Sequence, residues 1–326
     1  MLDVQLYITS PTGELLQPVV KETVEWHTER KSAPGKLTFD VIKDSKLNFQ
    51  EGAAVRFTVD GKNLFFGFVF TKKRDKENII TVTAYDQLRY LKNKDCIKYE
   101  NKKASQFIQM VANDYNLQCG EIADTGYIIA SRVEDNSTLF DMIENALDLT
   151  LTNNKEMFVM YDDFGKITLK NISDMKVGAE GAYLVIDDTT GENYEYTSSI
   201  DNDTYNKIKL TYENEDTGKR EVYITQDSSN INQWGILQYF DTLSEGENGR
   251  AKADALLKLY NSKTRKLKIT NAFGDVRVRA GCMVVINLNL GDIAVQNFML
   301  VEKVTHKFSL DQHTMDLTLR GGEFIV

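Results

Sequence analysis

The sequence predicts a β-rich α+β protein in which two small β-barrel modules flank an α+β insert. Three observations support this fold class: apolar residues alternate with polar ones over residues 1–95, recur at helical spacing within residues 96–180, and alternate again within residues 181–326. Period-two alternation between Gly-containing turns is typical of half-buried antiparallel strands, and spacing of three and four residues is typical of amphipathic helices. We therefore expect a first module at 1–95, the insert at 96–180, and a second module at 181–326 that contains an inserted helix.

A stretch in the first module returns, in a looser form, near the end of the chain. The first copy begins at Gly52 and turns at Asp60-Gly61, whereas the second begins at Gly281 and turns near Gly291. Both copies have the order strand, turn, strand, loop, strand, which indicates two copies of one β-module. The alternative is two unrelated β-meanders, since apolar and polar residues alternate in most strands. The alternating residues are Val55, Phe57, Val59, Ile80, Val82 and Ala84 in the first copy, and Val284, Ile286, Leu288, Met315, Leu317 and Leu319 in the second.

The insert changes to helical spacing. Apolar residues over 104–115 and 139–147 each fall on one helical face, and Thr138 with Asp141 has the spacing of a capping box. A hairpin that turns at Asp163-Phe164-Gly165 supplies a surface for both helices. The polar stretch 187–203 is expected to link the insert to the second module, and Ala253, Leu256, Leu257 and Tyr260 predict the inserted helix.

Length and composition narrow the class of protein. The chain has 326 residues, of which 27% are charged and 42% hydrophobic, so it is long enough for two or three packed cores. Cys96, Cys119 and Cys282 lie far apart without a CxxC pair, which predicts reduced thiols in a protein made in the cytoplasm. A secretory signal and a membrane anchor are not expected, because no apolar run approaches the roughly 18 residues that a membrane helix needs.

The net charge of the chain argues against nucleic acid as a partner. The formal net charge is −9, and no basic run is longer than Lys72-Lys73-Arg74. Wrapping nucleic acid requires many Lys and Arg residues to neutralise phosphates. The sequence therefore predicts no stable nucleic-acid binding.

No pattern for catalysis, cofactor binding or metal binding is found. The chain lacks a GxxxxGK[ST] loop, a GxGxxG after a strand, an HExxH and a GxSxG. His306 and His313 are seven residues apart across an expected hairpin and could approach each other, but two exposed strand histidines are favoured over a metal site. His27 follows Trp26 and has no recognisable partner. We therefore predict no catalytic residues, no cofactor and no metal.

Two further groups of residues, the paired carboxylates and a set of three aromatic residues, have alternative interpretations. Asp162-Asp163 and Asp187-Asp188 supply paired carboxylates, which a glycosidase needs on opposite sides of a sugar. Adjacent strand residues point to opposite faces, so a role in turns is favoured. Trp234, Tyr239 and Phe240 lie close in sequence and could form a platform for a sugar or a protein partner, although aromatic residues of β-rich chains usually belong to a core.

The order of parts resembles the baseplate hub proteins of contractile phage tails and phage-tail-like particles, in particular the XkdQ/YqbQ type found in defective prophages. The likeness covers nearly the whole chain and depends on the order barrel, insert, barrel. The residues that carry it are Val55-Arg56-Phe57, Asp60-Gly61, Leu64-Phe65, Gly67, Val69, Ala84-Tyr85-Asp86, residues 88–91 and 107–117, Thr138-Leu139, Gly235, Ala253, Leu256-Leu257, Gly281, Val284, Val304-Thr305-His306 and Met315-Asp316-Leu317.

The resemblance implies a non-enzymatic structural protein that acts in the virion after assembly in the bacterial cytoplasm. Three chains would form a homotrimeric ring at the end of the tail tube and hold the spike. The implied partners are the tail tube protein, the spike or needle protein, and other baseplate and tape-measure proteins. The alternative function is a tail-associated enzyme that cleaves cell-wall polysaccharide, or a sugar-binding module.

Overall fold

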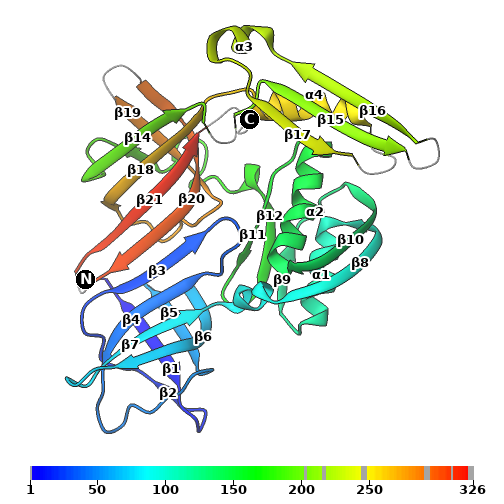
Figure 1. Ribbon diagram of the computed structural model, residues 1–326. Helices are drawn as coiled ribbons and strands as arrows, with labels where there is room; N and C mark the ends of the chain where they lie inside the picture. Colours follow the sequence, from blue (N-terminus) through cyan, green and yellow to red (C-terminus); the bar gives the residue numbers. More distant parts are fainter. Residues whose placement is uncertain are drawn as a thin grey trace.

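The computed structural model describes residues 2–201, 204–214, 218–243, 248–289, 294–309 and 311–321. Strands dominate, as the predicted β-rich class requires, and four hydrophobic cores hold the described residues together. The first module lies at the lower left of Figure 1, the second module at the upper left, and the insert at the right.

Seven strands form the first module. Their apolar residues alternate, so that β5 buries Val55, Phe57 and Val59 in a core with residues of β4 and β7. Burial on one face is what period-two alternation predicts. The strands are β1 (Val4–Thr9), β2 (Leu15–Leu16), β3 (Val24–Glu29), β4 (Lys36–Ile42), β5 (Ala54–Val59), β6 (Lys62–Arg74) and β7 (Ile79–Tyr85).

In the described residues of the second module, six strands surround a core of their own. Val284, Ile286 and Leu288 of its first hairpin are buried, as are Leu317 and Leu319 of its last strand. The strands are β13 (Val185–Asp187), β14 (Asn193–Ser199), β18 (Thr264–Phe273), β19 (Met283–Asn289), β20 (Ala294–Phe308) and β21 (His313–Gly321).

The two modules share one strand order. It is β5-β6-β7-β4-β3 in the first and β19-β20-β21-β18-β14 in the second, and every neighbouring pair is antiparallel. The modules differ in the strand that pairs with the outer edge of β5 or β19. In the first module β1 is antiparallel to β5, whereas in the second β13 is parallel to β19. Five strands with the same order and direction favour a repeated module over two unrelated meanders.

The modules are joined rather than separate. β3 of the first module pairs with β20 of the second, so thirteen strands of the described residues form one continuous sheet. The pairing of these strands does not close a barrel in either module. Closure into two barrels therefore stays a prediction, whereas the antiparallel β-architecture is present.

The insert packs two helices against small sheets. Helix α1 buries Phe107, Ile108 and Val111. Helix α2 begins at the predicted capping box, in which the Asp141 N–H donates to the Thr138 hydroxyl. Both helix predictions are confirmed. The elements are η1 (Gln87–Lys92), β8 (Lys94–Lys103), α1 (Ala104–Asp114), β9 (Cys119–Ile122), β10 (Ile128–Thr138), α2 (Leu139–Asn154), β11 (Phe158–Asp162), β12 (Ile167–Asn171) and η2 (Ile172–Asp174).

The second module contains a larger insertion than the single helix that its sequence predicts. Between β14 and β18 the described part of the chain forms three strands and two helices, which have a small core around Ile208, Leu210 and Leu256. The elements are β15 (Lys207–Asn214), β16 (Lys219–Gln226), α3 (Ser228–Trp234), β17 (Gln238–Thr242) and α4 (Gly249–Tyr260).

The polar stretch 187–203 is not only a link, as predicted from its sequence, because it contains strand β14. Most β14 side chains are exposed, with Tyr196 and Ser199 partly buried. A strand with little burial lacks the apolar alternation by which strands are recognised.

Candidate interaction surfaces

The pairing of β3 with β20 is the main contact between the two modules, and we call it the module joint. Its register places Glu29 opposite Lys303 and Val24 opposite Phe308. The Lys303 ammonium lies 2.5 Å from the Glu29 carboxylate. Nearby, Arg30 forms a two-pronged ion pair with Glu302, with Nε–Oε2 at 2.8 Å. Because the Arg30 side chain is 8% exposed, this pair is better shielded from solvent than a surface ion pair.

Phe308 of the second module inserts its side chain into the core of the first module. Its side chain is 1% exposed and belongs to the core of the first module, where its ring meets Phe57 edge-on at 5.2 Å between centroids. Trp26 of β3 stacks on His306 of β20 at 5.1 Å. The joint is therefore a shared apolar core as well as a strand pair.

The two histidines approach each other, as their spacing allowed. His306 Nε2 lies 2.8 Å from the Val278 carbonyl and therefore donates to it, so His306 Nδ1 accepts from His313 Nε2 at 2.8 Å. The expectation of two exposed histidines was wrong, because His306 is fully buried. Burial lowers the pKa of His306 to about 3, with His313 contributing, and burial lowers that of His313 to about 4. Both are neutral at pH 7.

Metal ligation is not supported at this pair. Over the residues that the structure describes, no cluster of three or more His, Cys, Asp or Glu side chains could hold a metal ion. His27 has a partner that the sequence did not reveal, because its Nδ1 lies 2.9 Å from the Thr305 hydroxyl across the joint. Burial lowers the pKa of His27 as well.

A buried polar cluster joins the insert to both modules. The Asp86 carboxylate, at the end of the first module, accepts from the Gly35 N–H at 2.8 Å. Asp162 of β11 accepts from Gln87 Nε2 at 3.0 Å and from the Gly165 N–H at 2.7 Å. Burial raises the pKa of Asp162 to about 6, and burial together with the nearby Asp162 raises that of Asp86 well above its usual value.

Arg279 of the second module completes this cluster. Its Nη2 donates to the Asp162 carbonyl at 2.8 Å, and its guanidinium lies 3.7 Å from the centroid of the Tyr161 ring. The positive charge also offsets part of the pKa rise of both carboxyls. Sequence reasoning did not connect Asp86 with Arg279, because they lie 193 positions apart in the chain (279 minus 86) and no local spacing relates them.

The structure places the carboxylates of the two Asp pairs in turns and in a buried cluster. Asp162 is 6% exposed and faces the cluster just described, whereas Asp163 is exposed in the hairpin turn. Asp187 accepts from the Thr189 N–H and hydroxyl in a tight turn, and these bonds lower its pKa. The turn interpretation is therefore favoured for Asp163 and Asp187.

The three aromatic residues do not form one platform. Tyr239 of β17 faces α4 and stacks on Tyr260 at 5.7 Å between centroids. Phe240, the next residue, points to the opposite face of the sheet and is 58% exposed. Trp234 is the last residue of α3 and is half-buried.

The turn residues of the repeat lie at corresponding places. Asp60 and Gly61 form the β5–β6 turn with φ of 48° and 72°, a region that Gly and Asp tolerate better than most residues. Gly52 and Gly281 precede β5 and β19, with φ of 84° and 93°. Gly291 lies outside the described residues.

One cavity of about 310 Å³ lies where the first module, the insert and the second module meet. Apolar residues of α2 and β11, including Ile143, Leu147 and Met160, line it, and Arg30 and Arg320 are among its charged residues. Glu144 and Asp148 also line it, but Glu144 accepts from Ser32 and Asp148 pairs with Lys31. No described helix is both long and apolar enough to cross a membrane.

The fold of the chain is shared with a solved tail protein. The structure resembles that of the 43 kDa tail protein of prophage MuSo2 from Shewanella oneidensis, with a TM-score of 0.68 at 12% identity over 97% of this chain and 98% of that chain. The chain thus shares its fold with this tail protein over nearly its whole length.

The sequence then gives the family. The YqbQ-like family model matches residues 24–320, so the chain belongs to the YqbQ-like family. It is 32% identical to the uncharacterised protein YqbQ of Bacillus subtilis (strain 168), over 96% of this chain and 95% of that protein. It is 29% identical to the phage-like element PBSX protein XkdQ of the same organism, over 96% of both chains. The resemblance inferred from the sequence is confirmed.

Proposed function

We propose that this chain is a structural baseplate hub protein of a contractile phage tail or tailocin. Three chains form a ring that adapts the six-fold tail tube to the three-fold spike. The observation that carries the proposal is the repeated strand order of the two modules, joined in one sheet. Three chains with two similar modules each supply six similar sites with only three-fold true symmetry.

The family and the fold support the tail assignment. XkdQ belongs to a phage-like element, and the MuSo2 neighbour is a tail protein. The proposed partners are the tube protein, the spike protein and other baseplate and tape-measure proteins, and the proposed location is the virion. In this proposal residues 1–95 and 181–326 act as barrel-like ring modules, and the insert at 96–180 projects from the ring.

Mass measurement of the purified chain at low and high salt tests the ring. Three chains of net charge −9 repel one another at low salt, and added salt screens that repulsion. We expect monomers at low salt and a larger trimer fraction at high salt or with tube or spike protein present. A stable dimer under all these conditions would contradict the proposal.

A second experiment tests the non-enzymatic part of the proposal. The chain is incubated with purified peptidoglycan, and released reducing ends and amines are followed. We expect no release. Turnover that disappears when one carboxylate is replaced would instead support the polysaccharide-cleaving alternative.

A further inference from the structure

We propose that β14 of one subunit pairs antiparallel with residues 71–74 of β6 of the next subunit, and so repeats between chains the module joint found within each chain. This inference rests on the proposed trimer and names its contact surface. It follows from the equivalence of the two modules, residue by residue.

β6 corresponds to β20. In the first module the Gly52 N–H donates to the Val69 carbonyl at 2.8 Å, and the register of β6 against β7 shifts between Val69 and Thr71. In the second, the Gly281 N–H donates to the Val301 carbonyl at 2.7 Å, and the register of β20 against β21 shifts between Val301 and Lys303. Thr71 thus corresponds to Lys303, and Arg74 to His306.

β14 corresponds to β3. Trp26 of β3 pairs with Leu37, which pairs with Ala84 of β7. Tyr196 of β14 pairs with Leu267, which pairs with Leu319 of β21. Trp26 and Tyr196 therefore hold equivalent positions, and so do His27 and Thr197.

These two equivalences fix the register of the proposed contact. In the module joint, His306 lies opposite Trp26 and Thr305 lies opposite His27. Between subunits, Arg74 then lies opposite Tyr196, and Lys73 lies opposite Thr197. Lys73 is also diagonal to Glu195 on the same face, a separation that long side chains can span.

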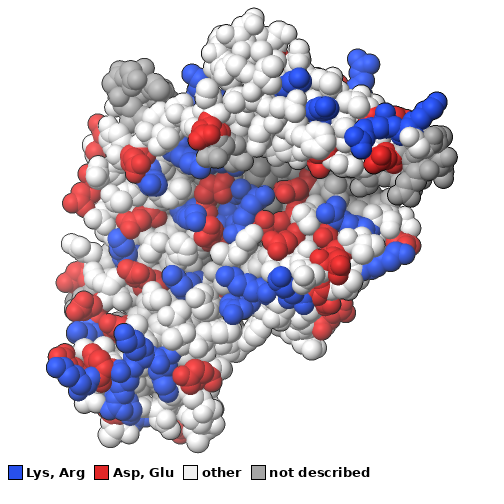
Figure 2. Space-filling model, viewed as in Figure 1, with Lys and Arg blue, Asp and Glu red and all other residues white. Residues whose placement is uncertain are grey.

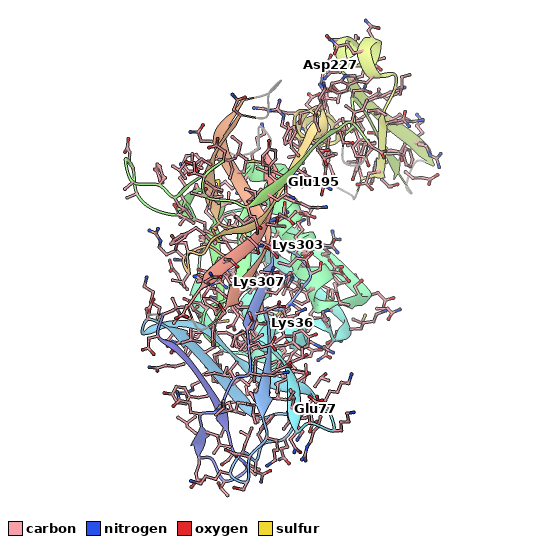
Figure 3. The ribbon with its side chains drawn as sticks, turned by 90° about the vertical axis from the view of Figure 1, so that its left-hand side faces the viewer. Lys36, Glu77, Glu195, Asp227, Lys303 and Lys307 are labelled. Atoms are coloured by element: carbon pink, nitrogen blue, oxygen red, sulfur yellow. The ribbon has the colours of Figure 1, made fainter. Side chains whose placement is uncertain are left out.

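Both strand edges are free in the described residues. β14 pairs only with β18, and β6 beyond Val69 pairs only with β7. A free edge presents unpaired N–H and C=O groups to another strand. Within one chain the two edges cannot meet: in Figure 3, Glu195 on β14 and Glu77, just beyond the end of β6, lie toward opposite ends of the long sheet, with Lys303 and Lys307 of the module joint between them.

Charge at the two edges is complementary. Residues 72–74 are Lys, Lys and Arg, and Figure 2 shows basic side chains, with a few acidic ones among them, gathered at the lower left, near where β6 ends and β7 begins in Figure 1. β14 carries Glu195, follows Glu192, and leaves Tyr194 46% exposed. The Glu195 carboxylate also pairs with Lys268 of β18 at 3.2 Å, so Lys73 of the next subunit would share it with Lys268. An arginine facing Tyr196 also permits a cation–π contact.

The contact between subunits is more polar than the joint within the chain. Trp26, His306 and Phe308 of the module joint correspond to Tyr196, Arg74 and Lys76. Lysines on a free edge prevent random strand pairing, so the monomer stays soluble until assembly. This explains how one repeat forms a permanent joint inside the chain and a reversible one between chains.

Disulfide trapping tests the register. Lys73→Cys and Thr197→Cys are introduced together into the full chain with the exposed Cys96 changed to Ser. Directly opposite strand residues have Cα atoms about 4.5–5.5 Å apart, within the range that a disulfide bridges. The matched control places cysteines at Lys73 and Val222, which is 48% exposed and outside the proposed contact.

Under mild oxidation at high salt, where the proposed trimer is favoured, we expect covalent species that stop at three chains, formed at least about tenfold faster than in the control because pairing holds the thiols together. Peptide mapping should identify the 73–197 link. If trimers form but the two pairs cross-link equally fast, the strand contact is overturned and the trimer stands. Covalent chains that grow beyond three subunits support the contact and overturn the closed trimer. No oligomer and no cross-linking above the control overturns both.

Discussion

Gly52 and Gly281 hold the same place in the two modules, and each has a positive φ. The Gly52 N–H donates to the Val69 carbonyl of β6, and the Gly281 N–H donates to the Val301 carbonyl of β20. Their surroundings differ. A Cβ on Gly281 would lie 2.4 Å from Val159 Cγ1 of the insert, whereas a Cβ on Gly52 would meet nothing within 4 Å. The two glycines are therefore a natural matched pair.

Replacing each glycine by alanine separates backbone strain from steric overlap. Gly52→Ala should cost about 1–2 kcal/mol of unfolding free energy, because only the left-handed backbone is strained. Gly281→Ala should cost about 1–3 kcal/mol more, because Val159 and β11 must also move. Urea unfolding of both variants measures the difference, and equal midpoints would show that Val159 yields without cost.

Phe308 should contribute much of the stability of the module joint. Phe308→Ala removes a fully buried ring from the first module's core, and losses of about 3–5 kcal/mol are typical of such changes. Phe273→Ala is the control, because Phe273 of β18 is 74% exposed and its loss should change stability by less than about 0.5 kcal/mol. Thermal and urea unfolding compare them, and similar effects of the two variants would contradict a shared core.

The His306–His313 pair should make the protein less stable in acid. Both pKa values are lower in the folded chain, about 3 and about 4, than the ordinary value of 6.5. Their contribution is therefore complete above pH 6.5 and is lost as the pH falls toward 4 and below. The expected result is a falling unfolding free energy over this window that becomes shallower in His313→Gln. An unchanged slope in that variant would show that the pair does not titrate on unfolding.

Asp162 should make the protein less stable as the pH rises, which is the opposite of the effect of the histidine pair. Its folded pKa of about 6 lies above the ordinary 3.8, so stability is lost as the pH rises from about 4 to about 6. Asp162→Asn cannot ionise, and relative to the unchanged chain it should gain up to about 3 kcal/mol between pH 4 and pH 7. The relevant comparison is the difference between the two chains at each pH, measured by urea unfolding. A constant difference would mean that Arg279 and the backbone donors already hold Asp162 ionised.

The sequence by itself determined the local elements. Alternation predicted β5 to β7 and β19 to β21, and helical spacing predicted α1, α2 and α4. The turn at Asp60-Gly61 and the capping box at Thr138 also follow from local chemistry, because each needs particular residues only a few positions apart. The order of these elements was enough to indicate the family.

Tertiary structure alone decided which edges and which distant side chains meet. Strand pairing uses backbone groups, which every residue has, so the sequence could not show that β3 joins β20 or that β14 pairs with β18 alone among the described strands. Asp86, Asp162 and Arg279 come from three parts of the chain, and no local spacing connects them. His306 lies on an alternating strand whatever its partner, and it is buried by the packing of β20 against β3 together with contacts to Val278 and His313. Local patterns report which face of an element is buried, whereas long-range contacts depend on what covers that face.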